Sequence, residues 1–336
     1  MTNKNIELNT TQNFQELSWD KISEEWEEIF NSFEGNRFFQ SQTIKNIWKN
    51  NFGKDSKYKI FVVSDTNNKM ISPFKINDQK YTFIGSKDLF DYQDFIYSDH
   101  IDIDELLESL VIFLSNDLSI KELELDSIPT SSPTIKKITE YLKKYNWDVE
   151  ISLEDVSPRL LLPETFEEYL LSLNKKNRHE IRRKLRRLDE IEGVRSYEFS
   201  DKKNIQENME EFFRLHRMST PDKNNFMTEN RENFFRDISI NMSTVGSTRL
   251  RFLEVDNKKV ATSLSFIKDN VKYLYNSGYD PEYSHLSVGV LNHVLSIQNS
   301  ILEKHTIFDF MRGDEVYKYR LGGVNETVSK LLAKKR

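Results

Sequence analysis

Short apolar runs separated by Asp and Asn residues occur twice in the chain, in the same order. They lie at 60–65, 70–76 and 80–84, and again at 251–256, 260–267 and 272–275. Runs of β-branched and aromatic residues between such turns are typical of β-strands. The pattern therefore predicts one three-stranded antiparallel meander in each half of the chain.

A helix and a further strand are predicted after each meander. In the first half, Leu107, Leu110 and Leu114 have helical spacing, and an alternating run at 120–125 follows. The second half repeats this order, with a helix predicted at 288–302 and a strand at 307–310. The duplication predicts an α/β protein with two domains, each a mixed, mostly antiparallel sheet flanked by helices.

Two prolines, Pro158 and Pro163, lie between the two halves, so we expect domains at 1–157 and 158–336. Directly after Pro163, the residues from Thr165 to Glu168 have the spacing of a capping box. In that motif the Thr hydroxyl accepts from a backbone N–H of the first helical turn, and the Glu side chain reaches back to the cap. A helix is therefore predicted to begin here.

Composition narrows the class of protein. The chain has 336 residues, 37% of them hydrophobic and 30% charged, and this balance is typical of globular proteins. No apolar run approaches the roughly 20 residues of a membrane span, and the first residues lack the apolar centre of a signal peptide. Cysteine is absent, which excludes disulfides and thiolate nucleophiles. We therefore expect a cytoplasmic protein.

Charge and histidine placement limit the ligands. The formal net charge is -6, which argues against a general nucleic-acid coat. The six histidines show no metal-ligand spacing, so we expect no metal. The histidines are His100, His179, His216, His285, His293 and His305.

A basic helix is predicted between Lys175 and Leu188. It contains Lys175, Lys176, Arg178, Arg182, Arg183, Lys184, Arg186 and Arg187, opposed within the segment only by Glu180. Ile181, Leu185 and Leu188 share one face and would pack on the core. The charged face then either binds an anion, such as the phosphates of a cofactor, RNA or a phospholipid head group, or is a solvated face balanced by Asp189, Glu190 and Glu192.

Glycines, tyrosines and acids gather in two segments of the second half. The first segment, 277–289, follows a predicted strand and leads into a predicted helix, and the second, 308–323, follows the next strand. Ligands of open α/β sheets bind near strand ends. Both segments are therefore candidates for the functional site. The alternative for Gly278, Asp280 and Pro281 is a purely structural role in a tight turn, because these are favoured turn residues.

These segments resemble a known family. The basic helix, the sequence from Ser277 to Tyr283 and the Phe308-to-Lys318 segment are similar to those of CelD-like acetyltransferases of the GNAT superfamily, which are related to the Fem peptidyltransferases. The similar segments are 160–188, 252–291 and 308–323, with a weaker likeness over 38–97. The resemblance implies tandem GNAT-like domains. It also implies transfer of an acyl group to an amine or hydroxyl, with acyl-CoA as the expected donor.

The resemblance also implies roles for individual residues. The helix beginning at Ser287, Val288 and Gly289 would hold the pyrophosphate of the donor with its backbone N–H groups. Further anion contacts are expected from Arg312, Arg182 and Arg183. Candidate general bases are Asp280, Asp309 and Asp314, and candidate donors to the oxyanion or leaving thiolate are Tyr279, Tyr317 and Lys318. Lys318 occupies a position similar to a late lysine of the Fem proteins. The alternative for Arg312 is a structural ion pair with Asp309 or Asp314.

One departure from the family pattern leaves the donor open. The usual pyrophosphate loop reads Arg/Gln-x-x-Gly-x-Gly/Ala, whereas residues 285–290 contain one glycine and no arginine. We therefore expect an acyl-CoA-dependent acyltransferase acting on a cell-envelope, polysaccharide or small-molecule acceptor. The alternatives are a Fem-like peptidyltransferase that uses aminoacyl-tRNA, and a non-catalytic protein that binds an anionic ligand.

Overall fold

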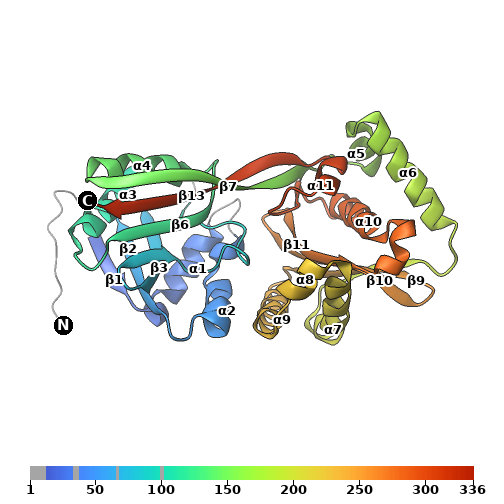
Figure 1. Ribbon diagram of the computed structural model, residues 1–336, viewed down its shortest axis with the longest axis horizontal. Helices are drawn as coiled ribbons and strands as arrows, with labels where there is room; N and C mark the ends of the chain where they lie inside the picture. Colours follow the sequence, from blue (N-terminus) through green and yellow to red (C-terminus); the bar gives the residue numbers. More distant parts are fainter. Residues whose placement is uncertain (1–12, 33–37, 66–67, 99–101) are drawn as a thin grey trace. The chain divides into compact units, whose positions relative to one another are not determined.

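The computed structural model describes residues 13–32, 38–65, 68–98 and 102–336 (Figure 1). The chain forms two compact units, one of Met1–Asp155 with Glu326–Arg336 and the other of Val156–Asn325. Two long strands, β7 (Trp147–Leu161) and β13 (Val324–Lys335), contribute residues to both units. The sequence placed 158–336 together, whereas the structure groups Glu326–Arg336 with the first unit, because β13 pairs there with β6 (Glu122–Pro129).

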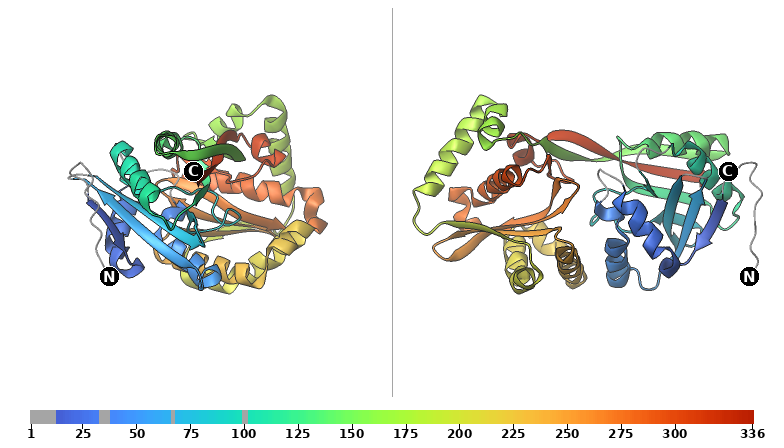
Figure 2. Two further views of the ribbon diagram at one scale, coloured as in Figure 1. Left: turned by 60° about the vertical axis from the view of Figure 1, so that its left-hand side comes forward. Right: turned by 180° about the vertical axis from the view of Figure 1, so that it is seen from behind.

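The first unit is a mixed, mostly antiparallel sheet with helices on both faces (Figures 1 and 2). Its strand order is β1-β2-β3-β4-β6-β13-β7, and β5 pairs with β3. The remaining strands are β1 (Asn13–Leu17), β2 (Lys57–Ser64), β3 (Lys69–Asn77), β4 (Lys80–Phe83) and β5 (Ile96–Tyr97). The helices are α1 (Ser23–Asn31), α2 (Gln42–Phe52), α3 (Asp104–Asn116) and α4 (Pro133–Lys144). Leu107, Leu110 and Leu114, the predicted helical stripe, are fully buried in its core.

The second unit repeats this plan with the strand order β7-β12-β11-β10-β9-β8. Its strands are β8 (Arg195–Phe199), β9 (Thr248–Val255), β10 (Lys258–Lys268), β11 (Val271–Tyr279) and β12 (Ile307–Asp309). Its helices are α5 (Phe166–Ser172), α6 (Lys175–Asp189), α7 (Lys202–Ser219), α8 (Pro221–Phe226), α9 (Glu229–Thr244), α10 (Val288–Leu302) and α11 (Val316–Arg320), with a 3-10 turn at Pro281–Leu286. Helices α7, α8 and α9 cover one face of the sheet and α10 covers the other (Figure 1).

The predicted fold class is confirmed, and so are both meanders. Helix α10 begins and ends where the periodicity places it. Thr165 accepts from the backbone N–H of Glu168, whose carboxylate accepts from the N–H of Thr165, so the capping box is also confirmed. These features follow from local pattern, because each depends on neighbouring residues in the chain.

The sheet of the second unit opens between β11 and β12. These strands run parallel and pair only from Val271 to Tyr273 within the described part of the chain. On its other edge, β11 continues to pair with β10 up to Tyr279, with a bulge that leaves Tyr275 out of register. A bulge bends the strand that carries it. From Leu274 onward, β11 therefore presents an edge that no described strand covers.

Candidate functional site at the open edge of β11

A lysine from α8 reaches the open edge of β11. The Nζ atom of Lys223 donates to the backbone oxygen of Ser277, 2.5 Å away. Helix α8 is held in position at its start, because the hydroxyl of Thr220 accepts from the backbone N–H of Lys223 and Pro221 occupies the first helical position. Lys223 is thus presented at the point where β11 and β12 have separated.

Two buried histidines lie near this lysine, one from each face of the sheet. His216 belongs to α7 and His293 to α10. Burial, reinforced by the charge of Lys223, lowers the pKa of each imidazole to about 3. Both rings are therefore neutral at pH 7. The ring of His293 stacks on that of Tyr317, with the centroids 5.0 Å apart.

The environment of Lys223 brings its proton affinity close to physiological pH. Burial lowers its pKa to about 8, with Glu315 opposing the shift and Lys318 adding to it. A group of this kind changes charge near neutral pH, as a general base must. Lys223, with His216, His293 and Glu315 around it, is therefore a candidate proton acceptor at the open strand edge.

Lys318 occupies a position similar to a late lysine of the Fem proteins. In this structure it acts as a clamp, a side chain that holds the loop at 311–313 in place. Its Nζ donates to the backbone oxygens of Met311, Arg312 and Gly313 at 2.7–3.1 Å, and it pairs with Glu315 at 2.8 Å. An ammonium has three N–H donors, and three carbonyls occupy them. Lys318 is only 2% exposed. The loop after β12 is thereby folded around its side chain.

The other sequence candidates are placed differently. Asp280 accepts from the backbone N–H of Glu282 and caps the 3-10 turn, in agreement with its turn interpretation. Asp314 is exposed and accepts from the Tyr319 hydroxyl. Asp309 is buried and pairs with Arg159 at 3.1 Å. The structure therefore brings Tyr317 and Lys318 to the site and gives the three aspartates structural contacts.

The start of α10 offers the backbone donors that the resemblance implies. The first α-helical bond runs from the N–H of Leu291 to the oxygen of Ser287, so the N–H groups of the preceding turn have no acceptor within the helix. Ser287 has a left-handed backbone, φ 59°, and makes no side-chain cap. A Cβ at Gly289 would lie 3.1 Å from the ring of Tyr279. Gly289 therefore lets this ring approach the first turn.

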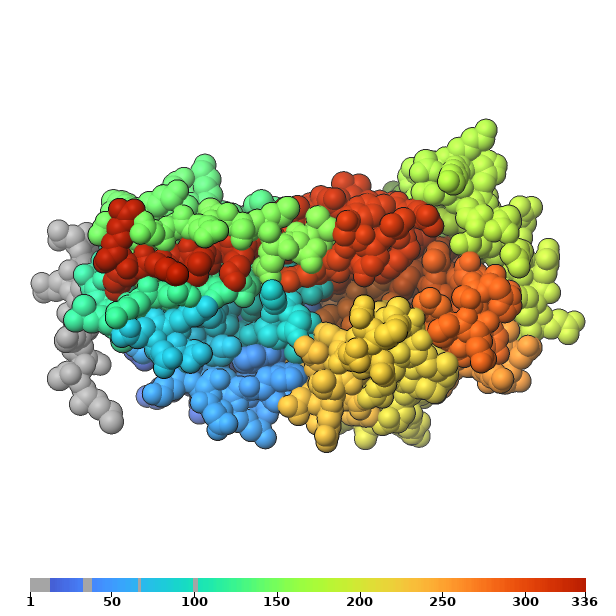
Figure 3. All heavy atoms as spheres, viewed as in Figure 1, coloured from blue at the N-terminus to red at the C-terminus, as the bar shows by residue number. Residues whose placement is uncertain are grey.

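Helix α6 lies beside the start of α10. Ile181 and Leu188 are buried as predicted, and Leu188 packs in one cluster with Val288 and Leu291. In the space-filling view the α5–α6 segment, in yellow-green, stands out from the rest of its unit (Figure 3). The basic face of α6 is thus held near the free N–H groups of α10.

Some of the basic residues on α6 already have partners. Arg182 pairs with Glu167, and Arg183 pairs with Glu180. Lys175, Lys176, Arg186 and Arg187 form no ion pair with any described residue. In the alternative interpretation Asp189, Glu190 and Glu192 balance this face, but none of the three forms an ion pair with a described residue. Uncompensated positive charge therefore remains beside α10.

Sequence reasoning missed Lys223, His216, His293 and Glu315. Lys223 lies in an ordinary polar stretch, and the histidines have no motif spacing. Only the packing of α7, α8 and α10 around β11 brings them together. Nothing in the pattern of the chain signals this convergence.

Neither a metal-binding cluster nor a membrane-spanning helix is found among the described residues. No group of three or more His, Asp or Glu residues in that part of the chain is arranged to hold a metal ion. None of the helices there is long and apolar enough to cross a membrane.

Comparisons with known proteins give the class of this domain. Residues 175–319 match the family described as "Acetyltransferase (GNAT) domain", so the second unit carries a domain of this family. The resemblance inferred from the sequence is thereby confirmed. A search of curated proteins finds no match.

Solved structures match over nearly the whole chain. The crystal structure of FemX has a TM-score of 0.65 at 11% identity and covers 95% of this chain and 96% of its own. The C-terminal domain (DUF2156) of a putative lysylphosphatidylglycerol synthetase from Agrobacterium fabrum has a TM-score of 0.60 at 10% identity, covering 94% and 92%. A protein of unknown function from Bacteroides thetaiotaomicron has a TM-score of 0.58 at 10% identity, covering 96% and 99%. At these identities the likeness establishes the fold alone.

Proposed function

We propose that the second unit transfers an acyl group from acyl-CoA to an amine or hydroxyl of a cell-envelope, polysaccharide or small-molecule acceptor in the cytoplasm. The observation that carries the proposal is Lys223 at the open edge of β11, with its pKa lowered to about 8 beside two neutral histidines. The GNAT match over 175–319 supplies the reaction class.

The proposal assigns the donor to the start of α10. The N–H groups of Val288, Gly289 and Val290 bind the pyrophosphate, because a helix N-terminus attracts anions. The basic face of α6 beside them adds long-range attraction for the phosphates. Arg312, on the loop clamped by Lys318, remains a proposed anion contact.

The reaction then takes place at the open edge. The acceptor nitrogen or oxygen attacks the thioester carbonyl carbon, its proton passes to neutral Lys223, and the bond from carbon to sulfur breaks. Backbone N–H groups at the open edge of β11 stabilise the oxyanion, and those of Ser277 and Tyr279 exchange their side-chain acceptors, Asn276 Oδ1 and Ser219 Oγ, for it. Burial raises the pKa of Tyr317, which keeps its hydroxyl protonated, and this hydroxyl donates to the leaving thiolate.

Ligand-induced thermal shift tests the donor. We expect acyl-CoA to raise the Tm, since a ligand at 100 times its Kd stabilises the folded state by about 2.7 kcal/mol. The panel contains CoA, acetyl-CoA, longer acyl-CoAs and bulk tRNA at two salt concentrations. In a Gly289→Trp variant the indole would fill the first turn of α10, so the CoA shift should disappear. A flat response to every CoA would reject the acyl-CoA proposal.

The Lys and Arg side chains of α6 that form no ion pair allow a test of the Fem-like alternative, in which the donor is aminoacyl-tRNA. Alanine at Lys175, Lys176, Arg186 and Arg187 should weaken anion binding but change the free energy of unfolding by less than about 0.5 kcal/mol per site, because these side chains are exposed. Arg214→Ala, which removes a basic residue of α7 that is paired with Glu211, is the control.

Which ligand binds more weakly to these alanine variants distinguishes the three candidate functions. Weakened acyl-CoA binding supports the proposal. A salt-dependent loss confined to tRNA binding would favour aminoacyl-tRNA as donor. Loss of anion binding in a protein that transfers no acyl group would favour the non-catalytic alternative.

A further inference from the structure

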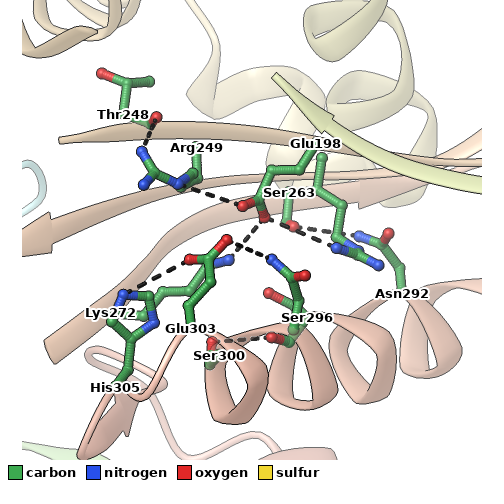
Figure 4. Close-up of polar contacts among 12 residues, drawn as sticks. Glu198, Thr248, Arg249, Ser263, Lys272, Asn292, Ser296, Ser300, Glu303 and His305 are labelled. Atoms are coloured by element: carbon green, nitrogen blue, oxygen red, sulfur yellow. Dashed lines mark hydrogen bonds and ion pairs between the residues drawn. The ribbon is translucent and has the colours of Figure 1, made fainter. Parts of the chain in front are cut away.

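One strip of the layer between α10 and the sheet of the second unit is polar, beside the apolar clusters that Leu291 and Val294 join. Asn292, Ser296 and Ser300 are spaced four residues apart, so they share the face of α10 that points to the sheet. All three are fully buried. Opposite them lie polar side chains from β8, β9, β10 and β11, among them Ser263 and Lys272 (Figure 4). A helix that covers a sheet normally buries apolar residues there.

Three cations in this layer share one carboxylate. Glu198 lies 2.7 Å from Lys272 Nζ, 3.5 Å from Arg249 Nε and 3.8 Å from Arg251 Nη1. A second carboxylate, Glu303, acts electrostatically on Arg251 and Lys272. Three positive charges against two negative ones leave the layer one negative charge short. A buried charge is costly unless it is compensated.

His305, which lies 3.7 Å from Glu303, does not add to this deficit. Burial lowers the pKa of its imidazole, so the ring is neutral at pH 7. Burial also lowers the pKa of Lys272 and of Arg251, against the attraction of Glu198. The layer is thus electrostatically unfavourable for the cations that it contains.

Polar atoms without partners lie in the same layer. Arg251 is 6% exposed, and its Nη2 donates to Ser196, but its Nε has no partner among the described residues. In that same part of the chain, Asn292 Oδ1 and Ser296 Oγ also have no partner. Buried polar groups in folded proteins are nearly always hydrogen-bonded. Unused donors next to an excess of positive charge indicate an anion rather than a void.

We propose that this layer binds one small monovalent anion, a halide ion or a small carboxylate, held by Arg251 and Ser296. The Arg251 Nε–H and the Ser296 hydroxyl donate to it. The Asn292 amide, turned by 180°, donates as well and accepts from Ser263, because the two ends of an amide are assigned from their partners. With the bound anion, three negative charges balance the three positive charges of the layer. The site is independent of the acyl-transfer proposal.

An isosteric substitution tests the missing charge. Asn292→Asp places a carboxylate next to Ser263, the residue of β10 that is paired with Arg251 of β9, without a change in volume. We expect its Tm in halide-free buffer to exceed that of the unchanged protein, and we expect its Tm to lose the dependence on chloride and formate that the unchanged protein shows at constant ionic strength. If no charge is missing, the extra buried carboxylate lowers the Tm instead, and that result overturns the proposal.

Two further measurements distinguish a bound halide, a bound carboxylate and a water molecule at this position. Asn299→Asp is the matched control, because Asn299 lies on the same helix but bonds Glu303 at an exposed position. It should not raise the Tm and should keep the anion dependence. Crystals grown in bromide should show an anomalous peak within hydrogen-bond distance of Arg251 Nε. A dependence on formate without such a peak identifies a carboxylate site, whereas water at that position and no anion dependence overturn the proposal.

Discussion

Replacing Lys223 with methionine is expected to lower kcat/KM for acyl transfer by about 10²- to 10⁴-fold, the usual contribution of a general base. The side chain lies at the open edge of β11 and bonds the oxygen of Ser277. Methionine is an unbranched side chain one atom shorter than lysine, and it accepts no proton. Because burying the lysine ammonium carries a desolvation cost, the Tm should stay within a few degrees of its original value. Steady-state kinetics and thermal unfolding of the same samples measure both.

The pH profile of activity is expected to identify Lys223 as the titrating group. Its pKa is lowered to about 8, so activity should rise as the pH passes through about 8 and level off above it, where the amine is neutral. Groups facing it are His216, His293, Glu315 and Lys318. Glu315 holds the pKa of Lys223 up, so Glu315→Gln should move the midpoint to lower pH. An unchanged midpoint, or full activity in Lys223→Met, would contradict the assignment.

The sequence specified those features that depend on near neighbours in the chain. The meander strands, the bounds of α10 and the cap at Thr165 were all predictable, because turn residues, helical spacing and capping act within a few residues. The buried stripe of α6, Ile181 and Leu188, was predictable for the same reason. These features established the fold class.

Strand β13 shows why other elements were missed. Its sequence from Val324 to Lys335 is rich in charge, and its apolar residues do not alternate strictly, because the pairing with β6 shifts register between Ser329 and Leu331. The irregularity brings both Val328 and Leu331 into the core. Period-2 alternation fails as a signal wherever a bulge of this kind lies in the strand.

The candidate site was predictable only in part. The start of α10 and Lys318 follow from the family resemblance, but the hydrogen bonds that bury the Lys318 ammonium do not. Its three carbonyl partners come from a loop in which Met311 and Gly313 have positive φ angles of 61° and 116°. The sequence shows the lysine and the glycine, but it does not show the loop conformation in which backbone oxygens accept all three hydrogens of the lysine ammonium.

Replacing Lys318 with methionine is accordingly expected to lower both stability and activity. The change leaves three backbone oxygens without a donor, and breaking a buried charged contact of this kind costs about 3–5 kcal/mol. For a unit of this size each kcal/mol corresponds to about 2–4 °C in Tm, so a fall of roughly 6–20 °C is expected. Loss of activity should follow from the released loop, which carries Arg312 and Glu315.

Two comparisons distinguish a clamp from a proton donor at Lys318. Glu315→Gln removes only its half-exposed ion pair, so the free energy of unfolding should change by less than about 1 kcal/mol. If Lys318→Met instead kept the original Tm and lost activity alone, the clamp would be contradicted. Lys318 would then act on the reacting atoms, as the resemblance to the Fem proteins implies. A parallel fall in Tm and kcat/KM, with the pH midpoint set by Lys223 unchanged in the remaining activity, would instead assign proton transfer to Lys223 and loop positioning to Lys318.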